Sequence, residues 1–199
     1  MKSIRLFCGV LLLLGVISLP AMAGSVSMQF IGLPTSNTYG GVASYPYNIS
    51  VNGEPNQWMM CIGYIEHIEG GETWQANIVP ANNWTLAERT AAYLYTWALQ
   101  VPNNPIATAD YNAAAWYAME GVPALDAAAS TYLNTATFYA TYLGAPRGVM
   151  LYQPVSGTES GTLGTPQVFL GSTPEPGALA LFGSGMIGLA GMLRRKFRG

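Results

Sequence analysis

Two apolar segments, one at each end of the chain, confine the part that can fold in water to the residues between them. Residues 6–19 form the first segment, and residues 177–193 form the second, a run of 17 residues without a charge. The residues between them, 24–171, are sufficient for one domain with its own hydrophobic core. We therefore expect a single folded domain, flanked by two segments that do not belong to its core.

The first 23 residues carry the parts of a secretory signal peptide in the expected order. Lys2 and Arg5 give a basic start, an apolar run follows, and Ala21-Met22-Ala23 matches the small-x-small cleavage pattern. We predict that this signal peptide, residues 1–23, is removed before Gly24 and that the remaining chain is exported.

Residues 172–199 have three parts in order: the triplet Pro174-Glu175-Pro176, the apolar run 177–193, and the basic cluster Arg194-Arg195-Lys196. A helix of 17 residues spans roughly 25 Å, which is at the short limit for crossing a membrane. Basic residues beside a span remain in the cytoplasm, so the domain before it lies outside. We therefore predict a C-terminal transmembrane helix over 177–193, with the topology that the signal peptide also implies.

This C-terminal tail resembles the PEP-CTERM protein-sorting signal of Gram-negative bacteria. The resemblance rests on the order of triplet, apolar span and basic cluster, and it covers about an eighth of the chain. It implies that an exosortase, an integral-membrane cysteine transpeptidase, recognises the precursor in the inner membrane and cleaves it near the triplet. It further implies delivery of the domain to the cell surface or to the exopolysaccharide matrix, with a role in biofilm or adhesion.

The charge of the domain limits its partners. Six of the eight Lys and Arg residues lie in the two end segments, so residues 24–172 keep only Arg89 and Arg147 against nine carboxylates. The resulting net charge of −7 opposes binding of nucleic acid, because phosphate contacts require Lys and Arg. A neutral or cationic partner, such as a polysaccharide or a divalent metal ion, is compatible with this charge.

Sequence periodicity changes from two to 3.6 and back to two along the domain, which predicts strands, then helices, then strands. Val26, Met28 and Phe30 alternate with other residues in the first strand, and Asn52-Gly53 is a strong hairpin signal. The expected strands are Ser25–Ile31, Tyr45–Val51, Trp58–Ile65, Thr73–Val79, Gly148–Pro154 and Gln167–Leu170. The first four of them form a β-meander in this interpretation.

Three helices are expected between the fourth and fifth strands. Thr85 and Glu88 form a capping box, and glycine and proline residues end the helical patterns. The expected helices are Leu86–Gln100, Ala109–Glu120 and Ala124–Leu143. We therefore predict an α+β fold, an antiparallel β-meander or small sandwich with an inserted three-helix layer.

Cys61 becomes the only cysteine once Cys8 is removed with the signal peptide, so no intramolecular disulfide is expected. Cys61 and the segment Asn112-Ala113-Ala114-Ala115-Trp116 resemble the thioester domains of bacterial surface adhesins, in which a cysteine on an early strand reacts with a glutamine on a helix. Asparagine stands here in the glutamine position, and its side chain is one methylene shorter. The resemblance names Cys61 and Asn112 as a candidate reactive pair. The other interpretation is that Cys61 is a small buried apolar residue.

Aromatic residues are frequent, and they include Trp97, Tyr111 and Tyr132. Exposed Trp and Tyr rings stack on sugar rings, which suits an exopolysaccharide ligand. However, several of these residues recur at helical spacing, as Tyr93 and Trp97 do, and this pattern is typical of a helix packing face. Both interpretations stay open from the sequence alone.

Glu66-His67, with Glu69 and Glu72 close by, holds the only histidine of the chain. A catalytic zinc site uses several protein ligands, often more than one of them histidine. We therefore expect a solvated polar hairpin tip here, with a weak divalent-cation site as the alternative. No metal site and no cofactor are predicted.

The sequence contains no nucleophile elbow, phosphate-binding loop or dinucleotide fingerprint, and we do not expect an enzyme. We expect an exported surface or extracellular-matrix protein with a structural or adhesion role. A thioester-type adhesin and a polysaccharide-binding module are the alternatives.

Overall fold

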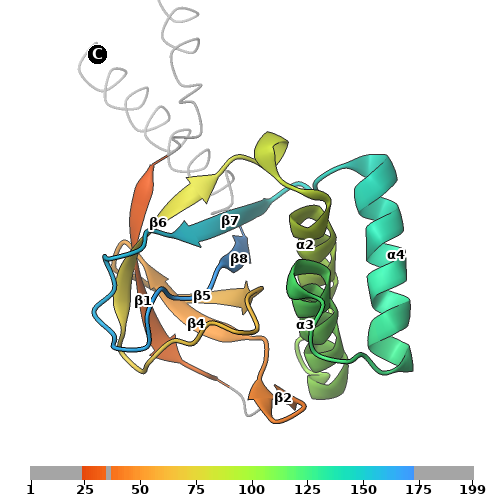
Figure 1. Cartoon of the computed structure of the whole chain (residues 1–199), viewed down its shortest axis with the longest axis horizontal. Coiled ribbons are helices and arrows are strands. Elements are labelled where there is room, and N and C mark those ends of the chain that lie inside the picture. The colour runs from red at the N-terminus through yellow and green to blue at the C-terminus, as the bar shows by residue number, and fades with distance from the viewer. Residues whose placement is uncertain (1–23, 35–36, 173–199) are drawn as a thin grey trace, which may run out of the picture.

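The computed structural model describes residues 24–34 and 37–172. Within these residues, six antiparallel strands close into a barrel in the order β1-β4-β5-β8-β7-β6, and three α-helices form a layer beside it (Figure 1). The barrel strands are β1 (Ser25–Gly32), β4 (Tyr47–Val51), β5 (Glu54–Cys61), β6 (Thr73–Val79), β7 (Val149–Pro154) and β8 (Phe169–Ser172). A small separate hairpin comprises β2 (Thr38–Tyr39) and β3 (Val42–Ala43). The predicted α+β class is confirmed.

Alternating side chains explain why β1 and β6 form adjoining walls of the barrel. Val26, Met28 and Phe30 are buried, whereas the residues between them along β1 are exposed. Trp74 and Ala76 of β6 are buried in the same way, and Trp74 lies directly opposite Met28 in the antiparallel register. The period of two therefore places one face of each strand in the barrel interior.

The predicted Asn52-Gly53 turn joins β4 to β5, and φ is positive at both residues, 52° and 83°. A two-residue turn with positive φ at both positions matches the twist of the strands that it connects, and asparagine and glycine adopt it with little strain. The hairpin places Tyr47 opposite Met59, and β5 ends two residues later at Cys61.

The strands close into a barrel and do not form the predicted β-meander or small sandwich. β6 pairs with β1 instead of β5, and β8 takes the place beside β5, where Phe169 lies opposite Cys61. β7 then connects β8 to β6. Closure gives every barrel strand a neighbour on both sides, so no barrel edge is left with unpaired backbone groups. The strand expected over Trp58–Ile65 ends at Cys61, and residues 62–72 form a loop.

The three predicted helices are present between β6 and β7: α2 (Leu86–Ala98), α3 (Pro105–Glu120) and α4 (Ala127–Leu143), preceded by the 3-10 helix η1 (Ala81–Asn83). Thr85 and Glu88 form the predicted capping box of α2. α3 begins earlier than predicted because Asn104 caps it and Pro105 fits its first turn. α4 begins later than predicted because Asp126 is its N-cap.

The helices α2 and α3 lie next to the barrel, and α4 lies on their far side (Figure 1). The hydroxyl of Tyr95 on α2 donates to the Trp58 carbonyl oxygen of β5 at 3.0 Å. α3 is buried along most of its length, including the run Ala113–Ala115. These small side chains allow neighbouring elements to approach the helix closely, so α3 connects the barrel to the outer part of the layer.

The two end segments are not part of this description. The predicted signal peptide, residues 1–23, and the predicted transmembrane helix, residues 177–193, lie outside the described residues. Among the residues that are described, no helix combines the length and the apolar character needed to cross a membrane.

Candidate functional site

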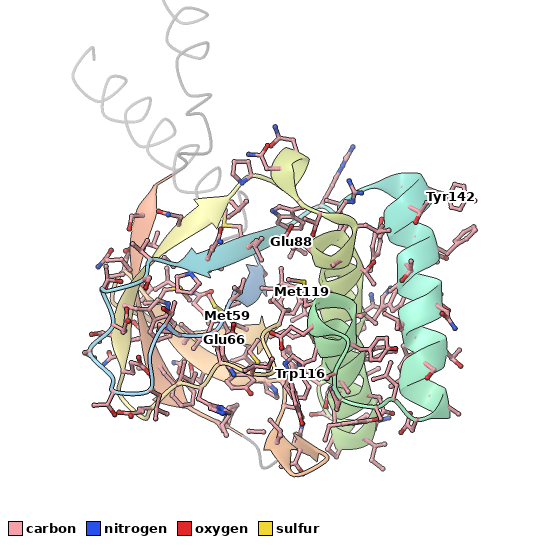
Figure 2. All side chains as sticks on the ribbon, viewed as in Figure 1. Met59, Glu66, Glu88, Trp116, Met119 and Tyr142 are labelled. Carbon is pink, nitrogen blue, oxygen red and sulfur yellow. The ribbon has the colours of Figure 1, made fainter. Side chains whose placement is uncertain are left out.

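The structure brings Cys61, Asn112 and Trp116 together where β5 meets α3. Asn112 and Trp116 are four residues apart and therefore lie on the same side of the helix. The indole N–H of Trp116 donates to Cys61 Sγ at 3.2 Å, and Asn112 Nδ2 donates to the Cys61 carbonyl oxygen at 2.8 Å. All three residues are fully buried. In Figure 2, Trp116 lies on the barrel side of the helical layer.

Both ends of the Asn112 amide are engaged by backbone groups. Asn112 Oδ1 accepts from the backbone N–H of Tyr45 at 2.6 Å, while Nδ2 donates to the Cys61 carbonyl oxygen. One side chain of α3 thus satisfies two buried backbone groups, one at the end of β5 and one just before β4. This arrangement positions α3 against the barrel and orients the amide toward the backbone of Cys61.

The environment of Cys61 keeps its sulfur in the thiol form. Burial raises the pKa of the Cys61 thiol to about 12, and the Trp116 N–H that donates to the sulfur offsets only part of this increase. The thiol itself donates to the Gly63 carbonyl oxygen at 3.4 Å. A thiolate, not a thiol, is the nucleophilic form of cysteine. The candidate reactive pair of Cys61 and Asn112 stays a prediction.

Glu120, at the end of α3, fixes the loop that follows Cys61. Its two carboxylate oxygens accept from the backbone N–H groups of Tyr64 and Ile65 at 3.1 and 3.2 Å. Burial raises the pKa of Glu120, and the nearby Glu66 carboxylate adds to the increase. No sequence pattern indicates this role, because Glu120 stands out only as the last residue of a predicted helix.

The expected solvated tip over residues 66–72 is corrected in part. Glu66 and His67 are exposed as expected, whereas Glu72 is only 3% exposed. Glu72 directly precedes β6 and lies on the same face as Trp74, so the strand alternation turns its carboxylate inward. Among the described residues, no three or more His, Cys, Asp or Glu side chains form a group that could hold a metal ion.

A groove between the three helices combines aromatic rings with uncharged polar groups. We call it the aromatic groove; it has a volume of about 400 Å³ and is lined by Trp97, Gln100, Val101, Tyr111, Thr131, Tyr132 and Thr135. The ring centroids of Tyr111 and Tyr132 are 4.3 Å apart, and those of Trp97 and Tyr111 are 6.2 Å apart. Each of these three rings is partly exposed.

Further aromatic side chains of α4 lie near the aromatic groove or farther along the same helix. Tyr139 packs its ring against Trp97 at a centroid distance of 5.8 Å. Farther along α4, Phe138 and Tyr142 are 60% and 72% exposed, and Figure 2 shows Tyr142 pointing away from the molecule. The whole of α4 contains no charged residue. The groove rings therefore pack against one another and remain partly exposed, and their binding to a sugar stays a prediction.

The three rings of the groove belong to the aromatic residues that the sequence already indicates as candidates. The polar residues that line the groove are not indicated by the sequence. Gln100 lies just beyond α2, and Thr131 and Thr135 lie one turn apart on α4. Their meeting depends on how α2 and α4 pack together, which no local pattern shows. The spacing of the two threonines was the only available signal.

The C-terminal tail matches the family model of the PEP-CTERM protein-sorting motif over residues 172–196. Of these residues, only Ser172 belongs to the described structure. The comparisons found no matching curated protein and no matching solved structure. The triplet Pro174-Glu175-Pro176 and the basic residues Arg194, Arg195 and Lys196 all lie within the matched range. The chain therefore carries the PEP-CTERM sorting motif, which supports an exported protein that is anchored in the membrane and then processed by an exosortase.

Proposed function

We propose that the exported domain acts without catalysis, as a surface or extracellular-matrix protein that adheres to neutral polysaccharide through the aromatic groove. The observation that carries the proposal is the composition of that groove. Trp97, Tyr111 and Tyr132 supply ring faces, and uncharged amide and hydroxyl groups lie beside them. The destination suggested by the sorting motif, a cell surface or a polysaccharide matrix, would place such a ligand within reach.

The chemistry of a sugar ring fits this lining. A pyranose ring has an apolar C–H face and a rim of hydroxyl groups, so it combines an aromatic contact with several hydrogen bonds. Tyr and Trp provide large, rigid contact surfaces, and Gln100 can donate and accept hydrogen bonds. The hydroxyls of Thr131 and Thr135 donate to backbone carbonyl oxygens one turn earlier, so they can accept hydrogen bonds from a ligand. The lining has no charge and the domain is acidic, with a net charge of −7 over residues 24–172. Both features favour a neutral glycan over a polyanion.

Loss of one groove ring is expected to weaken polysaccharide binding strongly. Buried aromatic anchors of binding sites cost about 2 kcal/mol or more when truncated, which corresponds to a loss of roughly 30-fold in affinity. We expect this loss for Tyr132→Ala with a neutral soluble glucan or with the purified exopolysaccharide of the producing bacterium. Isothermal titration calorimetry measures the affinity, and quenching of tryptophan fluorescence reports contact near Trp97.

Tyr142→Ala is the matched control, because Tyr142 is an exposed tyrosine of the same helix that does not line the aromatic groove. It should bind as the wild type does. Equal losses in both variants, or the absence of binding to every neutral glycan tested, would contradict the proposal without touching the sorting of the protein.

The sorting step has its own expected result. Replacing both Pro174 and Pro176 by alanine removes the rigid triplet that the exosortase recognises, so we expect the full-length precursor to accumulate in the inner membrane. Immunoblotting of membrane and extracellular fractions follows the processing. Pro34→Ala, an exposed proline of the domain, should be processed normally, and normal processing of the double variant would show that the triplet is not the recognised feature.

A further inference from the structure

The turn Glu69–Glu72 faces the middle of the long connection between β7 and β8. The hydroxyl of Thr162 donates to Glu69 Oε1 at 2.6 Å. Ser160 N donates to the Thr73 carbonyl oxygen at 2.9 Å, and Thr73 N donates to the Ser160 hydroxyl at 2.9 Å. We call this contact between residues 69–73 and residues 160–162 the acidic seam. It joins two segments that are about 90 residues apart in the chain.

The Glu72 carboxylate is enclosed in the acidic seam with one oxygen unsatisfied. Glu72 is 97% buried, and its Oε2 accepts from the Glu69 backbone N–H at 2.8 Å. Its Oε1 is buried and has no hydrogen-bond partner in the described part of the chain. A buried carboxylate oxygen without a partner is costly, and proteins relieve that cost with a hydrogen bond, a counter-charge or a metal ion.

The carboxylate of Glu72 packs against the backbone of Gly161. A Cβ atom at Gly161 would lie 2.5 Å from Glu72 Oε1, so only glycine permits this close approach. Oε1 therefore lies against the loop one residue away from Thr162, whose hydroxyl contacts the second carboxylate of the turn. The two carboxylates of the turn thus lie against adjacent residues of the loop, Glu72 at Gly161 and Glu69 at Thr162.

The domain supplies little positive charge that could compensate for a buried carboxylate. Residues 24–172 contain two arginines, Arg89 and Arg147, against nine carboxylates. Arg89 lies on α2, which follows the end of β6, and Arg147 precedes the start of β7, whereas the acidic seam lies at the opposite end of these two paired strands. A cation from solution is the remaining source of compensation.

We infer that the acidic seam binds a calcium ion through Glu72 Oε1, with the Glu69 carboxylate and the Thr162 hydroxyl as further oxygen ligands. Ca²⁺ accepts six to eight oxygen ligands in irregular geometry and completes its shell with backbone carbonyls and water. Zn²⁺ sites usually include histidine nitrogen or cysteine sulfur ligands, which the seam lacks, and Mg²⁺ demands a more regular octahedron. With two carboxylates, the affinity should fall in the range of extracellular modules, about 10⁻⁴ to 10⁻³ M. This inference is independent of the polysaccharide ligand proposed above.

Thermal unfolding of the purified full-length protein in detergent tests the inference. Adding about 10 mM Ca²⁺ after treatment with a chelator should raise the melting temperature by roughly 3–10 °C. Mg²⁺ at the same concentration should have a smaller effect. Glu72→Gln should remove the calcium-dependent shift, whereas Glu54→Gln, an exposed carboxylate at the start of β5, should retain it.

If Glu72→Gln fails to fold, a direct measurement of ion binding to the wild-type protein still tests the inference. Terbium, a luminescent substitute for calcium, should give an emission excited through Trp74, which lies two residues from Glu72 on the same strand face. Calcium should displace it from the wild-type protein. No shift and no displaceable emission in the wild type would overturn the inference, and so would an equal shift in Glu72→Gln.

Discussion

Replacing Asn112 by alanine is expected to lower the free energy of unfolding by about 3–5 kcal/mol, a change of roughly a thousandfold in the folding equilibrium. The substitution removes the partners of two buried backbone groups, the Tyr45 N–H and the Cys61 carbonyl oxygen. Each group left unsatisfied costs about 1–3 kcal/mol. The missing amide also leaves a small cavity between α3 and the barrel, which adds to the loss.

Urea denaturation followed by circular dichroism measures this change. Asn134→Ala is the matched control, because Asn134 is an exposed asparagine of α4. An exposed substitution of this kind changes stability by about 0.5 kcal/mol or less. If Asn112→Ala lost less than 1 kcal/mol, the two hydrogen bonds would not be the connection between α3 and the barrel that their geometry indicates.

The thiol of Cys61 is expected to react with an alkylating reagent at least about a thousandfold more slowly in the folded protein than in the unfolded chain. Burial raises its pKa to about 12, so at pH 8 the reactive thiolate is scarcely populated. Complete burial also prevents access of the reagent. The rate is measured by mass spectrometry on the exported protein, or on a Cys8→Ser variant of the full chain, with and without guanidinium.

The same experiment addresses the thioester-type alternative. If Cys61 is a packing residue, the unfolded protein shows its full expected mass and one thiol. A mass lower by one ammonia, together with no thiol after unfolding, would show a bond between Cys61 and Asn112 and would favour the reactive pair. Tyr47→Phe is the matched control, because Tyr47 belongs to the same buried cluster as Cys61 and the substitution keeps the ring and the thiol; it should show the same mass balance and one thiol.

The elements that the sequence predicted well are those that depend on neighbouring residues. Thr85 and Glu88 cap α2 through contacts within one turn, and Asn52-Gly53 needs only its own backbone conformation. The strand Thr73–Val79 was predicted with its observed limits, because its alternation is clear. The helix α3 begins before its predicted start, because its N-cap, Asn104, lies outside the apolar pattern that indicated the helix.

The features that the sequence did not predict depend on contacts between distant segments. The barrel closes because Leu170 of β8 pairs with Met60 of β5, a contact that no local periodicity specifies. Glu72 is buried although the turn was expected in solvent, because residues 160–162 of the connection between β7 and β8 pack against the turn. Cys61 and Asn112 were expected near each other, yet the atoms that meet are the amide and a backbone carbonyl, which only the packing of α3 determines.

The position of β8 has a mechanical consequence for a protein held by its tail. β8 lies between β5 and β7, and its last residue, Ser172, is the first residue of the sorting motif. Ser172 lies opposite Val149, the first residue of β7, so the tail and the chain that comes from the helices meet the β7–β8 pair at the same end. Tension between an anchored tail and a ligand on the helices would therefore separate β8 from β7 one hydrogen bond after another, instead of loading all of these bonds at once in shear.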